Sequence, residues 1–180
     1  MVSRLIRDKG VLEYVKAAEK IRERFPRTRF VLAGPAEVDN PTAIPKHQVE
    51  RWEANDTIEY VGYVDDVRPL IEEADCVVLP SYREGLPRSL LEASAMCRPI
   101  IAAATTGCRE VVEEGVTGLM CRPGDADDLA AKIEEFMHMP DNIRREMGLK
   151  GRIKMEREYD EEIVIGRYID ALSTLLSGAA

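Results

Sequence analysis

The sequence predicts an α/β fold in which a doubly wound, mostly parallel six-stranded sheet carries helices on both faces. Short, continuous apolar runs such as residues 76–79 and 99–103 alternate with longer segments of helical periodicity. Strands that are buried on both faces read as such continuous runs, and the alternation is typical of parallel sheets. With 180 residues, of which 45% are hydrophobic, we expect one domain, residues 1–180, around one core.

The chain is expected to open on a strand and a helix. Residues 1–6 read as the end of a strand with no lead-in, which predicts that the domain is cut from a longer protein. After a short turn, Leu12, Val15 and Ala18 repeat with the spacing of one helical face, so we expect a helix over residues 11–25.

The next strand, residues 30–33, closes at Gly34 and Pro35. Prolines bound a surface excursion over residues 37–56, in which we expect one short helix that Trp52 pins to the body.

A third strand over residues 57–61 turns at Gly62 and Tyr63 toward a helix over residues 67–73, for which Asp65 and Asp66 are suitable N-cap residues. The remaining elements follow the same alternation. They are strands over residues 76–79, 99–103 and 118–121, a helix opened by Pro87, a short helix over residues 108–112, and three closing helices over residues 125–139, 140–159 and 160–177, the first capped by Asp125.

Residues 81–99 are the stretch around which the chain is organised. They follow a buried strand and form a glycine-bearing loop and a helix, with Pro87 at the first helical turn, a position that proline favours. The free amides of such a turn and the helix dipole favour phosphate. Leu86, Arg88 and Ser89 can offer amides, whereas Pro87 has none.

Two glutamates bracket this predicted phosphate seat. Glu84 lies in the loop, and Glu92 lies eight positions later in the second turn of the helix. Because a carboxylate repels phosphate, we expect both to accept hydrogen bonds from neutral hydroxyls. A ligand whose phosphates bind backbone amides and whose hydroxyls bind carboxylates is a nucleotide sugar. The alternative is that both are ordinary surface glutamates in a glutamate-rich chain.

The other expected loops lie at the same edge, since ligands of open parallel sheets bind beyond the carboxyl ends of the strands. A diphosphate also needs positive charge, which a chain of net charge −8 must supply locally. Arg4 ends the first strand and Lys9 follows in the next loop, so both can reach one anion. The alternative for this basic pair is solvated surface.

Composition excludes several classes of protein. The net charge of −8 argues against a nucleic-acid partner. The four cysteines form no CxxC pair, and we expect buried free thiols and a reducing, cytoplasmic compartment. No apolar stretch approaches the roughly 20 residues that a membrane span needs. Neither His47 nor His138 has an acid or cysteine at ligand spacing, and we expect no metal site.

The residues themselves resemble a known family. The run Glu84-Gly85-Leu86-Pro87, the segment around Glu92, and residues 99–102 resemble the E-x7-E donor-binding motif of retaining glycosyltransferases of family four, which have the two-domain GT-B fold. Arg4-Leu5 and Lys9-Gly10 resemble the R-L…K-G motif of the same family. The similarity covers nearly the whole chain in the right order.

The resemblance implies a role for each matching residue. Arg4 and Lys9 would clamp the donor diphosphate, and Glu84 would orient the donor sugar as the residue nearest the chemistry. The backbone of Gly62, Tyr63 and Val64 would contact the base, Gly85, Leu86, Pro87, Arg88 and Ser89 would form the loop around the diphosphate, and Glu92 would bind the ribose hydroxyls. The implied donor is a nucleotide-diphosphate sugar, with UDP as the favoured nucleotide, and no metal is implied.

The sequence departs from the family pattern in two respects. Many members have glycine where this chain has Pro87, and the proline removes one amide donor. The family also places its acceptor site on an amino-terminal domain that this sequence does not contain. That domain is the expected partner, and any peripheral membrane association would run through it. The last helix of the family's fold usually crosses back to that domain, and the helix over residues 160–177 is either the remnant of that helix or ends short of the domain.

Two alternatives use the same residues differently. A nucleotide-sugar epimerase of the GT-B type would have the same donor site and would interconvert free nucleotide sugars without an acceptor. A non-catalytic interaction module would bind no nucleotide. It would leave the pairs Glu84/Glu92 and Arg4/Lys9 without an explanation.

Overall fold

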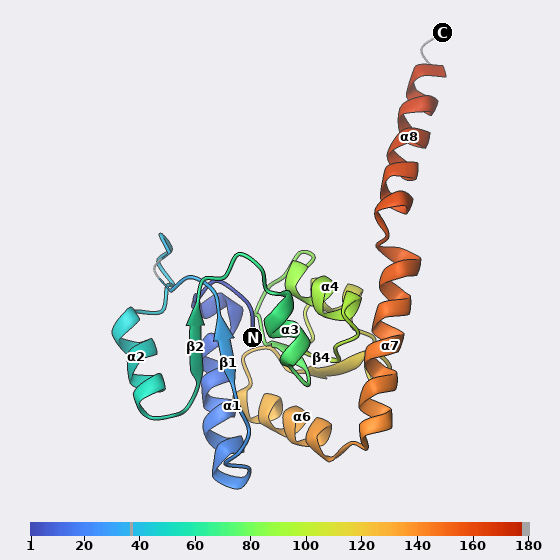
Figure 1. Ribbon diagram of the computed structural model, residues 1–180. Helices are drawn as coiled ribbons and strands as arrows, with labels where there is room; N and C mark the ends of the chain where they lie inside the picture. The colour runs from blue at the N-terminus through green and yellow to red at the C-terminus, as the bar shows by residue number, and fades with distance from the viewer. Residues whose placement is uncertain (37, 178–180) are drawn as a thin grey trace.

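The computed structural model describes residues 1–36 and 38–177, and Figure 1 shows helices surrounding short parallel strands, with one long helix projecting from the body. The described elements in chain order are η1 (Arg7–Lys9), α1 (Val11–Arg24), β1 (Val31–Ala33), α2 (Lys46–Ala54), β2 (Glu59–Gly62), α3 (Arg68–Glu73), β3 (Val77–Leu79), α4 (Arg88–Ala95), β4 (Ile100–Ala103), α5 (Thr106–Val111), β5 (Gly118–Cys121), α6 (Ala126–His138), α7 (Asp141–Glu158) and α8 (Glu161–Ser177).

All strand pairs are parallel, which confirms the predicted sheet type. β1 pairs with β2, and β3, β4 and β5 form a second sheet in sequence order. The expected first strand is reduced to a parallel bridge between Val2 and Ala33, backed by the hydrogen bond from the Ser3 amide to the Ala33 carbonyl (3.0 Å). Parallel backbone pairing continues on both sides of this bridge, since the Ala33 amide donates to the Met1 carbonyl (2.9 Å) and the Leu5 amide to the Pro35 carbonyl (3.0 Å), before the chain turns into η1 at Arg7. The described residues therefore form five strands in two sheets rather than one six-stranded sheet.

The core lies along β3 and β4, in which every residue is buried. This burial explains why the two strands read as continuous apolar runs. α4 contacts both strands and packs on α7, while α6 contacts β4 and β5 and packs on α1. In α1 the buried face includes Val11, Tyr14 and Ile21, whereas Leu12 is only partly buried. The predicted anchoring role of Trp52 is confirmed, since its side chain is buried in the core cluster.

Most helix boundaries agree with the predictions to within one or two residues, and the caps explain the differences. The N-cap of α3 is Val67, so the prediction that Asp65 or Asp66 is the N-cap residue is wrong. The Asp66 carboxylate, one residue before the N-cap, accepts a hydrogen bond from the Arg68 amide (3.0 Å). Pro87 is the N-cap of α4 and lies just before the first helical residue. The excursion before α2 begins at Glu37, which lies outside the described residues.

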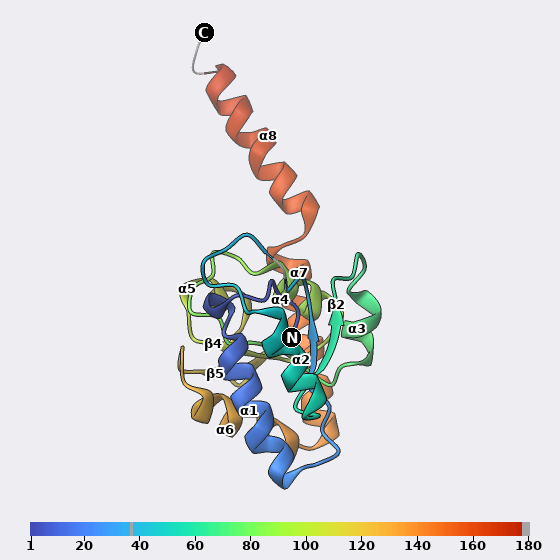
Figure 2. The same ribbon diagram turned by 90° about the vertical axis from the view of Figure 1, so that its left-hand side faces the viewer.

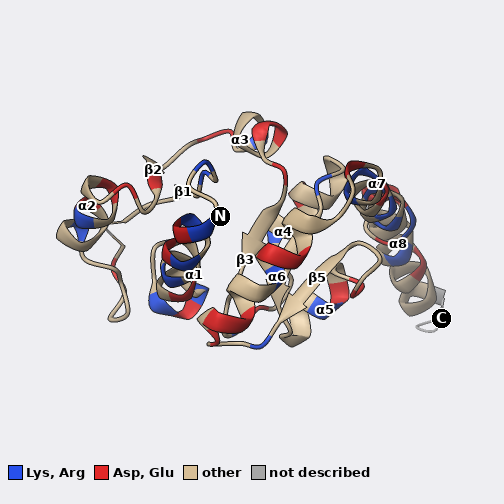
Figure 3. Ribbon diagram, turned by 90° about the horizontal axis from the view of Figure 1, so that it is seen from below, with Lys and Arg blue, Asp and Glu red and all other residues tan. Residues whose placement is uncertain are grey.

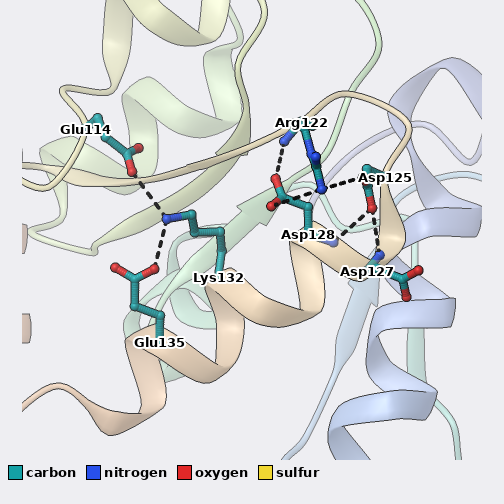
Figure 4. Close-up of polar contacts among 7 residues, drawn as sticks. All are labelled: Glu114, Arg122, Asp125, Asp127, Asp128, Lys132 and Glu135. Atoms are coloured by element: carbon teal, nitrogen blue, oxygen red, sulfur yellow. Dashed lines mark hydrogen bonds and ion pairs between the residues drawn. The ribbon is translucent and has the colours of Figure 1, made fainter.

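The start of α6 confirms the predicted cap. The Asp125 carboxylate accepts hydrogen bonds from the amides of Asp127 (3.1 Å) and Asp128 (2.9 Å), as Figure 4 shows. Arg122 holds the carboxylates of Asp125 (2.9 Å) and Asp128 (3.6 Å). Further along the helix, Lys132 bridges Glu114 (3.6 Å) and Glu135 (2.9 Å). The acidic residues at the start of α6 thus accept hydrogen bonds from the free amides of its first turn and form ion pairs with Arg122.

Surface charge is mixed rather than segregated. The ribbon in Figure 3 shows acidic and basic residues interspersed along α1 and α7. Several on α7 form pairs one helical turn apart, such as Glu146 with Lys150 and Arg152 with Glu156, both at 2.7 Å. Exposed pairs of this kind contribute only about 0.3–0.5 kcal/mol each.

α8 leaves the body of the molecule in both views (Figures 1 and 2). It exposes a set of large apolar side chains, namely Val164, Ile165, Tyr168, Ile169, Leu172, Leu175 and Leu176. Within residues 1–36 and 38–177, no helix combines the length and apolar character that crossing a membrane requires.

Gly10 gives a test of a close backbone approach beside the loop after β3. Gly10 and Gly115 both have a left-handed φ, +74° and +72°, but a Cβ on Gly10 would lie 2.1 Å from the Pro80 carbonyl oxygen, whereas one on Gly115 would meet nothing within 4 Å. We expect Gly115→Ala to cost about 1–2 kcal/mol of unfolding free energy for the left-handed backbone alone. Gly10→Ala adds a steric clash, so we expect a markedly larger loss in urea unfolding. Equal losses would contradict the close approach.

Candidate functional site

The loops that follow the strands are tied together by backbone hydrogen bonds. The Gly34 amide, after β1, donates to the Gly62 carbonyl at the end of β2 (2.7 Å). The Leu5 amide, just before η1, donates to the Pro35 carbonyl (3.0 Å), and the Tyr82 amide, after β3, donates to the Asp8 carbonyl (2.9 Å). The carboxyl ends of the strands and η1 therefore form one continuous edge, as the sequence predicts.

The loop after β3 is enclosed between η1 and α5 by two close backbone contacts. On one side Gly10 approaches the Pro80 carbonyl, and on the other a Cβ on Gly107 would lie 1.9 Å from the Gly85 carbonyl oxygen. Side chains larger than glycine cannot occupy these two positions without moving the loop. The backbone on both sides of Glu84 is therefore fixed.

Lys9 and Glu84 form an ion pair across this edge. The Lys9 ammonium donates to both Glu84 carboxylate oxygens, at 2.7 Å and 2.9 Å. The Glu84 side chain is only 7% exposed and that of Lys9 is 21% exposed. Two residues that are 75 positions apart in the chain are thus brought into direct contact, and the carboxylate is neutralised where it is buried.

The first turn of α4 presents free backbone donors beside this pair. The Pro87 carbonyl accepts from the amides of Leu90 (3.0 Å) and Leu91 (3.2 Å). Within the described part of the chain, the amides of Arg88 and Ser89 have no backbone acceptor. As N-cap, Pro87 keeps an extended backbone (φ −75°, ψ 108°) that lets these amides point out of the helix end.

Glu92 pairs with Arg88 one turn earlier on α4, at 3.5 Å, and its side chain is partly exposed. The two motif glutamates thus each face a different cation, Glu84 facing Lys9 and Glu92 facing Arg88. Both carboxylates are at the site edge, and Glu92 is the more accessible of the two.

The remaining predicted residues lie around this centre. Arg4 is exposed, and its guanidinium has no hydrogen-bond or ion-pair partner within residues 1–36 and 38–177. Gly62 has a left-handed φ of +74°, Tyr63 is 69% exposed and Val64 is half-buried. Leu86 and the backbone of Gly85 are exposed. The structure thus leaves Arg4 and Tyr63 free to contact a ligand.

One pair of residues escapes sequence reasoning. The Tyr82 hydroxyl donates to the Glu13 carboxylate at 2.8 Å, linking the loop after β3 to the first turn of α1. Glu13 resembles an ordinary acidic residue of a helix start, and nothing in its local pattern indicates that it is buried.

The four cysteines are free, but only Cys108 and Cys121 are fully buried, whereas Cys76 and Cys97 are partly buried. Burial raises the pKa of Cys76 and Cys121 to about 12 and also raises that of Cys108. These thiols stay protonated near pH 7 and pack as small apolar groups, which confirms the predicted free, buried state of Cys108 and Cys121. Among the described residues, no three His, Cys, Asp or Glu side chains are grouped so that they could hold a metal ion.

Comparisons with known proteins give one consistent family. A model of the family described as "Glycosyl transferases group 1" matches residues 1–154. The chain is 30% identical over 169 residues to N,N'-diacetylbacillosaminyl-diphospho-undecaprenol alpha-1,3-N-acetylgalactosaminyltransferase of Campylobacter jejuni, covering 94% of this chain and 42% of that protein. It is 29% identical to the putative glycosyltransferase EpsD of Bacillus subtilis, covering 94% of this chain and 43% of that one.

Solved structures share the fold. Anabaena Alr3699/HepE in complex with UDP superposes with a TM-score of 0.85 at 23% identity, over 96% of this chain and 47% of that one. A glycosyltransferase from Rickettsia africae gives a TM-score of 0.86 at 21% identity, over 98% of this chain and 47% of that one. The chain therefore spans less than half the length of the relatives it matches.

The buried ion pair can be tested by unfolding. Lys9→Met leaves the Glu84 carboxylate, 7% exposed, without its cation. We expect a loss of about 1–3 kcal/mol in unfolding free energy, the penalty for an unsatisfied buried group. The matched control is Lys46→Met, which breaks an exposed pair with Glu50 at 3.9 Å and is expected to cost under about 0.5 kcal/mol. Similar losses for the two variants would contradict the structural role of the pair.

Proposed function

Since this chain belongs to the group 1 glycosyl transferases, we propose that it forms the donor-binding part of a hexosyltransferase that works with retention of configuration. The donor is a nucleotide-diphosphate sugar, with UDP as the nucleotide, and the acceptor is a growing glycan or a lipid-linked saccharide. Alr3699/HepE was solved with UDP and with UDP-glucose, which supports the choice of nucleotide. The Campylobacter relative is named for a diphospho-undecaprenol substrate, which supports a lipid-linked acceptor.

The Lys9–Glu84 pair is the observation that carries this proposal. A lysine ammonium has three N–H donors, and Lys9 uses two of them on the Glu84 oxygens. The third remains for a phosphate oxygen. Lys9 can therefore hold a diphosphate while it neutralises the nearby carboxylate, which solves the repulsion that a bare glutamate beside a phosphate would create.

The same geometry gives Glu84 a defined task. With its charge balanced by Lys9, the carboxylate can still accept hydrogen bonds from sugar hydroxyls, because each oxygen has more than one lone pair. Glu84 is thus proposed to orient the donor sugar without attacking it. Its fixed backbone, between the contacts at Gly10 and Gly107, supports this orienting role.

The remaining groups complete the donor site. Arg4 is proposed as the second cation of the diphosphate clamp, and the Arg88 and Ser89 amides as its neutral donors. Glu92 would take the ribose hydroxyls by exchanging its Arg88 contact, and the exposed segment from Gly62 to Val64 would contact the base. The cations Lys9 and Arg4 and the Arg88 and Ser89 amides would together stabilise the leaving diphosphate as the anomeric bond breaks. The proposal gives this task to side chains and amides rather than to a metal.

The acceptor is proposed to bind on a second, amino-terminal domain, in the cytoplasm, and any peripheral membrane association would run through that domain. Two observations support a further domain. The chain spans less than half of its relatives, and the apolar face of α8 is exposed. By itself the chain is expected to bind donor without transferring sugar.

Nucleotide titration tests the donor site directly. We expect calorimetric titration with UDP, GDP and ADP to show micromolar to millimolar binding of UDP, and we expect Glu92→Ala to weaken it by about tenfold, since a hydrogen bond to a charged group is worth about 1.5–3 kcal/mol. Glu50→Ala is the matched control, because Glu50 also pairs with a basic residue one turn away on an exposed helix. Binding that Glu92→Ala leaves unchanged would contradict the ribose assignment.

The diphosphate clamp has its own test. Arg4→Ala removes an exposed guanidinium with no described partner, so the fold should be unaffected, while affinity for UDP should fall by about tenfold or more. Affinity for uridine, followed by NMR titration, should change little because uridine carries no phosphate. Arg7→Ala, an exposed arginine in the adjoining η1, is the control. An equal loss for UDP and uridine would overturn the assignment of Arg4.

A further inference from the structure

Glu13 is a buried carboxylate that forms no ion pair with any of the described residues. It lies in the first turn of α1 and is 7% exposed. One of its oxygens, Oε1, accepts the hydrogen bond from the Tyr82 hydroxyl, and the other, Oε2, has no hydrogen-bond partner among the described residues. Burying a charged or polar group with a partner missing is costly. The Glu13 carboxylate is therefore expected to have a role other than stabilising the fold, and that role must involve its one hydrogen bond, to Tyr82.

Tyr82 makes that one contact from the loop that carries Glu84. Its ring is 39% exposed, while its amide is held by the Asp8 carbonyl at 2.9 Å and its hydroxyl by Glu13. Burial and the hydrogen bond to Glu13 raise the pKa of Tyr82 to about 12. The phenol therefore stays protonated, and remains a donor, throughout the physiological pH range.

Two residues of the loop, Tyr82 and Glu84, thus bind residues near the start of the chain. Tyr82 is bound to Asp8 and Glu13, and Glu84 is bound to Lys9. A further, weaker contact runs from the Ser81 hydroxyl to the Lys9 carbonyl at 3.5 Å. The Tyr82 ring also lies near Gly124, since a Cβ added to that glycine would sit 3.4 Å from Cε1. Tyr82 therefore approaches both α1 and the loop after β5.

We infer that Glu13 and Tyr82 form a positioning pair that fixes the loop so that the Glu84 carboxylate faces the donor sugar. Neither residue touches the donor in this assignment. The inference rests on the proposed function only for the identity of the ligand. The loop anchor itself is a property of the chain without ligand.

The loop anchor is tested first, without any nucleotide. Three variants are compared: Tyr82→Phe, which removes the donor; Glu13→Gln, which keeps an oxygen acceptor; and the double variant Tyr82→Phe/Glu13→Leu, which removes both polar partners. Tyr82→Phe leaves a buried carboxylate unpaired and should lower stability, whereas replacing both partners by apolar groups can be nearly neutral. The double variant should therefore regain most of the lost stability.

Amide hydrogen exchange of residues 81–86 then separates positioning from stability. We expect exchange in this loop to quicken by about tenfold, the effect of one lost hydrogen bond, in Tyr82→Phe and equally in the double variant. Glu13→Gln should stay close to the parent. If the double variant regains both its stability and the parent's slow loop exchange, the pair is merely structural and the inference is overturned.

Titration with UDP-glucose and with UDP gives the functional result. A misplaced Glu84 should weaken UDP-glucose binding by about tenfold in Tyr82→Phe and in the double variant, with less than a twofold change for UDP. Equal losses for the two ligands, or parent-like binding of UDP-glucose by the double variant, would overturn the role toward the sugar. If the parent chain binds neither ligand, the proposed function fails instead, and the exchange experiment still decides whether the loop anchor exists.

Discussion

The close approach of Gly10 to the Pro80 carbonyl is the constraint on which the rest of the site depends. It brings the first loop of the chain against the loop after β3, so that Lys9 reaches Glu84 and the Asp8 carbonyl reaches the Tyr82 amide. Position 10 requires glycine for two reasons, because its φ is left-handed and because a Cβ there would clash with the Pro80 carbonyl oxygen. The contact explains how one edge of the sheet gathers residues from distant parts of the sequence.

Electrostatic balance is the second feature that makes this edge suitable for an anion. The chain carries a net charge of −8, and the site itself contains the carboxylates of Glu84 and Glu92. Each is matched by a cation, Lys9 and Arg88, while the Arg4 guanidinium has no such partner among the described residues. The positive charge at this edge is therefore local, which fits a single diphosphate better than the extended phosphate backbone of a nucleic acid.

Local patterns predicted the fold well, and contacts between distant residues defined the limits of prediction. The apolar runs of β3 and β4 and the Asp125 cap follow from neighbouring residues alone, and all were found. The partner of Glu84 could not be read from spacing, because Lys9 is 75 positions away. Burial of Glu13 was equally hidden, since a helix start favours an acidic residue for its own reasons. The expected first strand is present as one bridge with flanking backbone hydrogen bonds, and sequence periodicity does not report how the strands divide into two sheets.

The exposed face of α8 raises the question of what stabilises a helix that stands apart from the body. Isolated helices of about 12–15 residues are marginal in water, and most helical stability in proteins comes from packing an apolar face. α8 has 17 residues, and its large apolar side chains are exposed, so its own body supplies little of that packing. The proposed acceptor domain would supply that packing. Donor binding and domain docking would then be two requirements of one reaction, with this chain contributing the first from its own residues and the second through α8.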